Sequence, residues 1–171
     1  METWDAIRSR RNVREFTDEP LTDEQLQRIL EAAWRSPSSR NSQPWDFIVV
    51  TDREQLRELS KVWRGGAHIS GAAVAIAIVV DDEPDPHARE SARYDIGQAS
   101  LQMMAVAADL GIGSGHSSVG DQDLARQILG FPEGKVVRYI IDFGFPADRA
   151  LKPIQKPDRR PFDEVIHRGR W

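Results

Sequence analysis

Apolar residues recur at helical spacing in the first part of the chain. A capping box at Thr22–Gln25 predicts the start of a helix, and Pro37 requires the helix to end before it. Between them, apolar residues follow the i, i+3, i+4, i+7, i+8 pattern of one buried face: Leu26, Ile29, Leu30, Ala33 and Trp34. A shorter helix is expected over Thr3–Ile7, with Trp4 on its apolar side.

A third helix is expected after Asp52, whose carboxylate suits an N-cap, and Gly65-Gly66 would end it. Its apolar positions are Leu56, Leu59, Val62 and Trp63. Because Trp34 and Trp63 both fall on apolar helix faces, we expect both indole rings in the core.

Three segments have the composition of strands. Residues 47–51 and 135–143 are rich in β-branched and aromatic residues. The run Ala72–Val80 is apolar throughout, which is typical of a central strand covered on both faces.

The longest predicted helix runs from about Ala88 to Leu110 and contains no proline. At 1.5 Å per residue it would be about 30 Å long and cross the whole domain. Its apolar residues lie on more than one side, as expected for a helix packed against a sheet and a second surface, such as another subunit. Gly97 marks either a close approach by a neighbour or a tolerated surface glycine.

The rest of the chain is less regular. Residues 110–120 are mostly small, Asp121 caps a short helix that ends at Gly130, and residues 146–171 carry four prolines and few apolar side chains. The order of elements predicts a single domain over 1–171 of class α+β or α/β, with helices on a mixed sheet and an extended tail at 146–171.

Composition excludes several classes of protein. The 171 residues include no cysteine, so disulfides, thiolate metal sites and iron–sulfur clusters are ruled out. The longest apolar run has nine residues, too short to span a bilayer, and the N-terminal segment is charged. We therefore expect a cytoplasmic protein that does not enter membranes.

The net charge of −4 is unevenly distributed. Residues 1–16 sum to +1 and residues 146–171 to +3, whereas residues 17–145 sum to −8. Two basic ends on an acidic body indicate either an anion site or two solvated tails. Nucleic acid is disfavoured, because the domain is acidic and no aromatic residue interleaves with the N-terminal arginines.

Two segments are candidates for binding chemistry. Ser9–Arg14 contains three arginines whose guanidinium groups match the oxygens of a phosphate, although a solvated helix end would have the same composition. Residues 37–45 gather hydroxyl and carboxamide groups between two prolines, which suits recognition of a flat heterocycle.

Together these segments resemble the flavin-dependent nitroreductase family. The resemblance extends over the whole chain, in order: S-R-R-N-V-R-E-F from Ser9, S-P-S-S-R-N-S-Q-P-W-D-F from Ser36, Y-D-I-G-Q-A from Tyr94, L-G-I-G-S-G from Leu110, F-G-F-P from Phe143, and the C-terminal R-R-P-F-D-E-V-I-H-R-G-R-W. It implies an α+β fold that dimerises through the long helix, with FMN at two sites between the subunits.

The resemblance also assigns site residues. It places the flavin phosphate and pyrimidine against Arg10, Arg11, Asn12 and Arg14, where Asn12 replaces the usual serine. It brings in Pro37, Ser38, Ser39 and Asn41 from the partner subunit, and it lines the ring near N5 with Gly113, Ser114, Ser117 and Ser118. Arg159 and Arg160 would reach the phosphate from the tail, which would wrap the second subunit.

The activity implied is that of an NAD(P)H oxidoreductase that alternates between NADH or NADPH and a small-molecule acceptor such as a nitroaromatic or quinone. No catalytic side chain is required, because the flavin carries the chemistry. Alternatives are another reaction on the same fold (dehalogenation, azoline oxidation or flavin cleavage) and a flavin-binding protein without turnover.

Three other motifs carry weaker signals. His116 is the one histidine in a suspected ligand segment, and an ordinary loop histidine is the simpler interpretation. The glycines at 111, 113 and 115 follow a helix, whereas a dinucleotide fingerprint follows a strand. The acidic residues at 81–85 fit no EF-hand spacing, so no metal site is expected.

Overall fold

Six helices and four strands form the domain in the computed structural model, which describes residues 1–171. The helices are α1 (Thr3–Ser9), α2 (Asp23–Trp34), α3 (Arg53–Leu59), α4 (Pro86–Asp109), α5 (Gln122–Leu129) and α6 (Phe162–Val165). The strands are β1 (Asp46–Val50), β2 (Val74–Asp81), β3 (Gly113–Ser118) and β4 (Lys135–Gly144), and short 3₁₀ turns lie at η1 (Ser39–Asn41), η2 (Ser60–Val62) and η3 (Ala67–Gly71). The α+β class is confirmed.

The sheet has the order β1-β2-β4-β3, and every neighbouring pair is antiparallel. The expected mixed sheet is therefore wrong. Helix α4 carries the chain over so that β3 runs in the same direction as β2, but β4 lies between them and runs against both. Parallel pairing is limited to an isolated bridge between Asn12 and Ser114.

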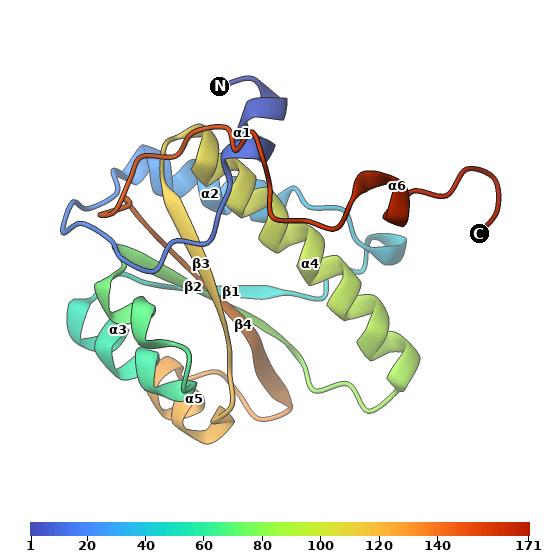
Figure 1. Ribbon diagram of the computed structural model, residues 1–171. Coiled ribbons are helices and arrows are strands. Elements are labelled where there is room, and N and C mark those ends of the chain that lie inside the picture. Colours follow the sequence, from blue (N-terminus) through green and yellow to red (C-terminus); the bar gives the residue numbers. More distant parts are fainter.

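Two cores cover the two faces of the sheet. On one face, Ile76 and Ile78 of β2 pack with residues of α2 and α4. On the other face, Ala75 and Ala77 pack with α3, α5 and Ile69 of η3. Figure 1 shows α4 crossing the first face, with α3 and α5 together on the second. The unbroken apolar run of β2 follows from this burial on both sides.

The predicted starts of α2, α3 and α5 and the predicted end of α5 are confirmed by hydrogen bonds and backbone geometry, whereas the predicted end at Gly65-Gly66 is wrong, because α3 ends at Leu59 and a 3₁₀ turn follows it. The Gln25 N–H donates to Thr22 Oγ1 while the Gln25 carboxamide oxygen accepts from the Thr22 N–H, so the capping box of α2 is complete. Asp52 and Asp121 accept from backbone N–H groups at the starts of α3 and α5. Gly130 ends α5 with a φ of +71°, a conformation that favours glycine.

The tryptophans differ from the prediction. Trp34 is the last residue of α2 and 65% exposed, so its expected place in the core of the chain is wrong. The buried face of α2 is narrower than the periodicity indicated and centres on Ile29 and Ala33. Trp63 is only partly buried.

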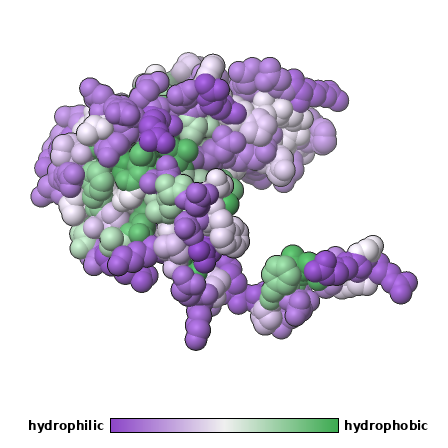
Figure 2. Space-filling view, turned by 90° about the horizontal axis from the view of Figure 1, so that it is seen from above, coloured by the Kyte–Doolittle hydropathy of each residue, from purple (hydrophilic) through white to green (hydrophobic).

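Residues 146–171 leave the domain as an extended arm. The arm first runs beside the N-terminal segment, where the Ala147 N–H donates to the Glu15 carbonyl and the Ile154 N–H donates to the Arg8 carbonyl, 3.0 Å each. Beyond Ile154 every residue is exposed. Figures 1 and 2 show this arm reaching away from the main body, with α6 near its end. None of the helices has the length and hydropathy needed to span a membrane.

Candidate functional site

The basic N-terminal segment lies along the outer edge of β3. The Val13 N–H donates to the Ser114 carbonyl at 2.9 Å, and Asn12 forms the parallel bridge to Ser114. Val13 itself is buried, with 1% of its surface exposed. The structure thereby brings together two sets of predicted site residues that are about 100 positions apart in the sequence: Arg10, Asn12 and Arg14 with Gly113, Ser114, Ser117 and Ser118.

Two glycines of β3 allow this close approach. A Cβ on Gly113 would lie 2.6 Å from Val13 Cγ2. A Cβ on Gly115 would lie 2.8 Å from Arg14 Nη1 and 2.9 Å from both carboxylate oxygens of Asp142. Real Cβ atoms do not come this close to other atoms, so both positions require glycine. The small residues of β3, which give no clear secondary-structure signal in the sequence, therefore allow the strand to lie beside the N-terminal segment.

Arg10 and Arg14 carry charges that no carboxylate neutralises within the chain. Neither forms an ion pair, and Arg14 Nη1 donates only to the carbonyl of its own neighbour Val13, at 3.1 Å. Arg11 is different, because its guanidinium donates to Asp148 at 2.6 Å and to the Arg149 carbonyl at 2.7 Å. The hydrogen bond from Arg11 lowers the pKa of Asp148. The structure thus separates Arg11 from the two free guanidinium groups.

The outer edge of β3 also offers backbone donors. The Ser114 carbonyl accepts from Val13 on that edge, and the alternation of antiparallel pairing places the N–H groups of His116 and Ser118 on the same edge. The Ser117 hydroxyl is buried and donates to the Ser118 carbonyl at 2.9 Å. Burial lowers the pKa of His116, and the nearby positive charge of Arg14 lowers it further, so this imidazole is neutral at pH 7.

The predicted loop from Pro37 to Asn41 lies elsewhere, against the first half of α4. The Ser39 N–H donates to Asp95 Oδ2 at 3.0 Å, and the Asn41 N–H donates to the Ser38 carbonyl at 3.0 Å. Two clefts of 360 and 540 Å³ border this loop. Arg10 instead lines a cleft of 470 Å³ between α1 and the second half of α4. The clefts that border this loop do not include Arg10, and the cleft that Arg10 lines does not include the loop.

The hydrogen bonds of the two tail arginines lie within the arm itself. Arg159 donates to the carbonyl of Asp158 at 2.6 Å, and Arg160 donates to the Glu164 carbonyl at 3.3 Å. Both side chains lie on the exposed part of the arm.

Three buried polar residues near these segments were not anticipated. Asp95 in α4 is 1% exposed and anchors the loop at Ser39. Asp142 in β4 is fully buried and bonds to His68 of η3 at 2.8 Å. The sequence held a signal in both cases, since each aspartate interrupts an otherwise apolar stretch, Ile140 to Phe143 in β4 and the buried side of α4.

The residues at the edge of β3 fit an anionic, planar cofactor. Arg10 and Arg14 provide two unpaired guanidinium groups, the β3 edge provides N–H donors, and the glycines at 113 and 115 remove side chains that would fill the approach. For a metal ion the donor set is poor: no group of three His, Asp or Glu side chains is arranged to bind one.

Comparison with known proteins gives the family. The sequence model of the family described as "Nitroreductase family" matches residues 7–73. A protein of Archaeoglobus fulgidus, provisionally named an NADH dehydrogenase/NAD(P)H nitroreductase, is 34% identical over 169 residues, which cover 96% of each chain. An FMN-dependent nitroreductase structure from Clostridium difficile matches with a TM-score of 0.84 at 27% identity, over 97% of this chain and 98% of that one.

A longer structure is also similar. The NADPH:FMN oxidoreductase of Vibrio harveyi in complex with NAD⁺ matches with a TM-score of 0.83 at 26% identity, over 97% of this chain but 76% of that one. The present chain is therefore a shorter version of the same fold. On these grounds, with its α+β fold and glycine-lined β3 edge, the chain belongs to the nitroreductase family of oxidoreductases.

Proposed function

We propose that the protein binds FMN at the edge of β3 and uses NADH or NADPH to reduce a small acceptor, such as a nitroaromatic or a quinone. The observation that carries this proposal is the placement of Arg10 and Arg14, without carboxylate partners, beside a strand edge kept open by Gly113 and Gly115. Relatives named FMN-dependent nitroreductase and NAD(P)H-dependent FMN reductase support the same cofactor and reductant.

Each part of the site has a distinct task in this proposal. Bound FMN supplies the capacity to accept a hydride and pass it on. Arg10 and Arg14 hold the anionic and pyrimidine parts of the cofactor through charge-assisted hydrogen bonds, and Asn12 and Ser114 fix the backbone that carries them. The N–H groups of His116 and Ser118 donate to the ring from the β3 edge.

The working unit in this proposal is a homodimer. A stripe of exposed apolar residues runs over α1 and α4: Trp4 is 64% exposed, Leu101 56% and Tyr94 72%. Gly97 lies on the same stripe, and a Cβ there would meet no atom within 4 Å in the chain. A second copy covering this stripe would bury it and bring the Pro37–Asn41 loop of one subunit to the β3 edge of the other.

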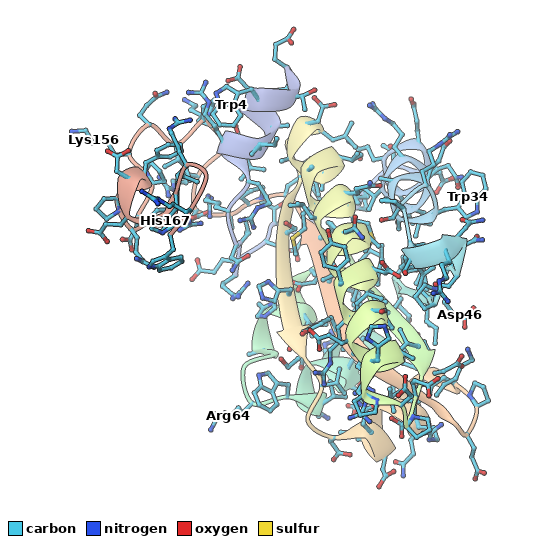
Figure 3. The ribbon with its side chains drawn as sticks, turned by 90° about the vertical axis from the view of Figure 1, so that its right-hand side faces the viewer. Trp4, Trp34, Asp46, Arg64, Lys156 and His167 are labelled. Atoms are coloured by element: carbon cyan, nitrogen blue, oxygen red, sulfur yellow. The ribbon has the colours of Figure 1, made fainter.

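The tail completes the dimer. It exposes Phe162, Val165, Ile166 and Trp171, which have no apolar surface to pack on in their own chain. In Figure 3, Lys156 and His167 mark the tail on one side of α4, and the exposed Trp34 lies on the other side. By wrapping the partner, the tail would bring Arg159 and Arg160 toward the phosphate.

Flavin binding tests the cofactor. The purified protein should be yellow, release FMN on denaturation, and bleach when NADH or NADPH is added without oxygen. Arg10→Ala and Arg14→Ala should each weaken FMN binding at least about tenfold, or ~1.4 kcal/mol, because each removes a charge-assisted contact. Arg57→Ala is the control, since Arg57 pairs with Glu54 on the surface of α3. A colourless protein that cannot be reconstituted with FMN would refute the proposal.

Sedimentation tests the dimer. Truncation after Ile154 removes only exposed residues and should yield a monomer with weakened FMN binding, as should Leu101→Glu. Gln127→Glu, on the exposed side of α5, should leave the dimer intact. A truncated chain that remains a dimer with full flavin would show that the tail does not hold the subunits together. A panel of acceptors that reoxidise the reduced protein then identifies the substrate class.

A further inference from the structure

A buried histidine–aspartate pair lies beneath the β3 edge. His68 Nδ1 of η3 and Asp142 Oδ2 of β4 are 2.8 Å apart, and their side chains are 4% and 0% exposed. Ionisable side chains are rarely buried so completely, because removing a charge from water costs several kcal/mol. The nitroreductase function as described so far uses neither residue.

Each side chain of the pair has one buried polar atom left unpaired. His68 Nε2 and Asp142 Oδ1 are both buried and have no hydrogen-bond partner. If His68 carries its proton on Nδ1, the N–H donates to Asp142 Oδ2. The unpartnered Nε2 is then an acceptor without a proton, and burying an unpaired acceptor costs less than burying an unpaired cationic N–H. In this arrangement Asp142 accepts from His68 through Oδ2, and its Oδ1 has no hydrogen-bond partner.

The Asp142 carboxylate lies against the candidate flavin site. Asp142 is paired in register with Gly115, and both Asp142 oxygens lie 2.9 Å from the position of a Gly115 Cβ. Arg14 Nη1 lies 2.8 Å from the same position, although Arg14 and Asp142 form no ion pair. Because Gly115 has no side chain, the Arg14 guanidinium and the Asp142 carboxylate can both approach the same position on β3.

The field of Asp142 reaches the open side of β3. Burial lowers the pKa of His116, and Arg14, Arg10 and His68 lower it further, whereas the Asp142 carboxylate raises it. His116 is partly shielded from water and partly exposed, and it neighbours Gly115 on the strand that would face the flavin. A negative charge that acts on His116 also acts on a ring bound at the same edge.

We propose that Asp142, held in place by His68, is a positioning residue that lowers the reduction potential of bound FMN. Hydride transfer from NAD(P)H adds two electrons and one proton to the ring, which leaves reduced FMN with one more negative charge. Asp142 opposes that charge and offsets part of the stabilisation from Arg14, so bound reduced FMN would give up its two electrons to the acceptor more readily. The inference rests on the proposed function, since it needs FMN at the β3 edge.

The test is the midpoint potential of bound FMN, measured by spectroelectrochemistry on the full-length holoprotein, together with the affinity for oxidised FMN. Asp142→Asn keeps the shape and the bond to His68 but removes the charge. We expect it to favour reduced over oxidised FMN by about tenfold, which is about +30 mV for a two-electron couple. His68→Gln retains a donor to the carboxylate and should leave the potential near that of the wild type.

Two further variants complete the experiment. Asp81→Asn removes an exposed carboxylate at the far end of β2 and should not move the potential. If Asp142→Asn does not fold, the double variant His68→Leu/Asp142→Leu replaces the buried pair with apolar side chains, a change that proteins often tolerate, and should show the same positive shift.

The outcomes separate the two levels of inference. A purely structural role for the pair would weaken oxidised and reduced FMN equally and leave the potential unchanged, which would overturn the inference while the flavin function stands. A shift of the same size in Asp81→Asn would also overturn it. Wild-type protein that binds no FMN would overturn the proposed function and, with it, this inference.

Discussion

A single methyl group added at Gly115 should disturb both Arg14 and Asp142 at the candidate site. In Gly115→Ala the new Cβ would lie 2.8 Å from Arg14 Nη1 and 2.9 Å from both oxygens of Asp142. The tip of Arg14 is flexible and can move away. Asp142 is fully buried and bonded to His68 at 2.8 Å, so it can move only by disturbing that bond.

The expected cost follows from this crowding. Overpacking a tight interior by one methyl group typically costs about 1–3 kcal/mol. For a chain of this size, 1 kcal/mol corresponds to a fall in Tm of about 2–4 °C. We therefore expect Gly115→Ala to lower the free energy of unfolding by about 1–3 kcal/mol and to weaken FMN binding by displacing Arg14.

Urea unfolding followed by circular dichroism measures the loss, and Gly71→Ala is the matched control. A Cβ on Gly71 meets no atom within 4 Å, so that change should stay within about 0.5 kcal/mol of the wild type. If the two variants were equally stable, the close approach of Arg14 and Asp142 to Gly115 would be wrong.

Two further predictions concern the loop and the strand edge. Asp95→Ala removes the acceptor of the Ser39 N–H and should lower the free energy of unfolding by about 1.5–3 kcal/mol, with faster trypsin cleavage at Arg40; unchanged cleavage would contradict the anchoring role. His116 should titrate in NMR with a pKa below 6.5, because burial and then Arg14 oppose its charged form. Protonation therefore costs the folded state more than the unfolded chain, and the contribution of His116 to stability is lost as the pH falls below 6.5. Arg14→Gln should raise this pKa, and an unchanged titration would show that the arginine does not act on the imidazole.

Most helices and three of the strands could be predicted because their signals are local. Capping at Thr22, Asp52 and Asp121 depends on residues three positions apart, and burial of β2 on both faces leaves an unbroken apolar run. The short helix at the start of the chain and the C-cap at Gly130 are of the same kind.

The remaining features depend on contacts that a sequence pattern does not contain. β3 has few apolar side chains because it is an edge strand that must admit Val13 and Arg14 closely, so its glycines and serines hide it from a periodicity search. The sheet is antiparallel because β4 lies between β2 and β3. This pairing joins strands that are far apart in the sequence, so no local pattern indicates it. Trp34 continues the period of α2 but lies beyond the surface that α4 covers.

The candidate site was predicted through family resemblance, and its geometry needed the structure. The sequence shows arginines at 10, 11 and 14 as equivalent, whereas only Arg11 is paired with Asp148. Likewise, nothing local to Asp142 or His68 indicates that they meet across 74 positions.

The contact between the Ile154 N–H and the Arg8 carbonyl fixes the point at which the fully exposed part of the arm begins. The 17 residues beyond Ile154 then behave as a tether, and a flexible tether of that length has a root-mean-square reach of about 20–25 Å. Once two chains have met at α4, each arm searches for its binding surface as an intramolecular partner, at an effective concentration in the millimolar range. Arm docking then adds avidity to the first contact, and shortening the tether should weaken assembly abruptly once it can no longer span the distance.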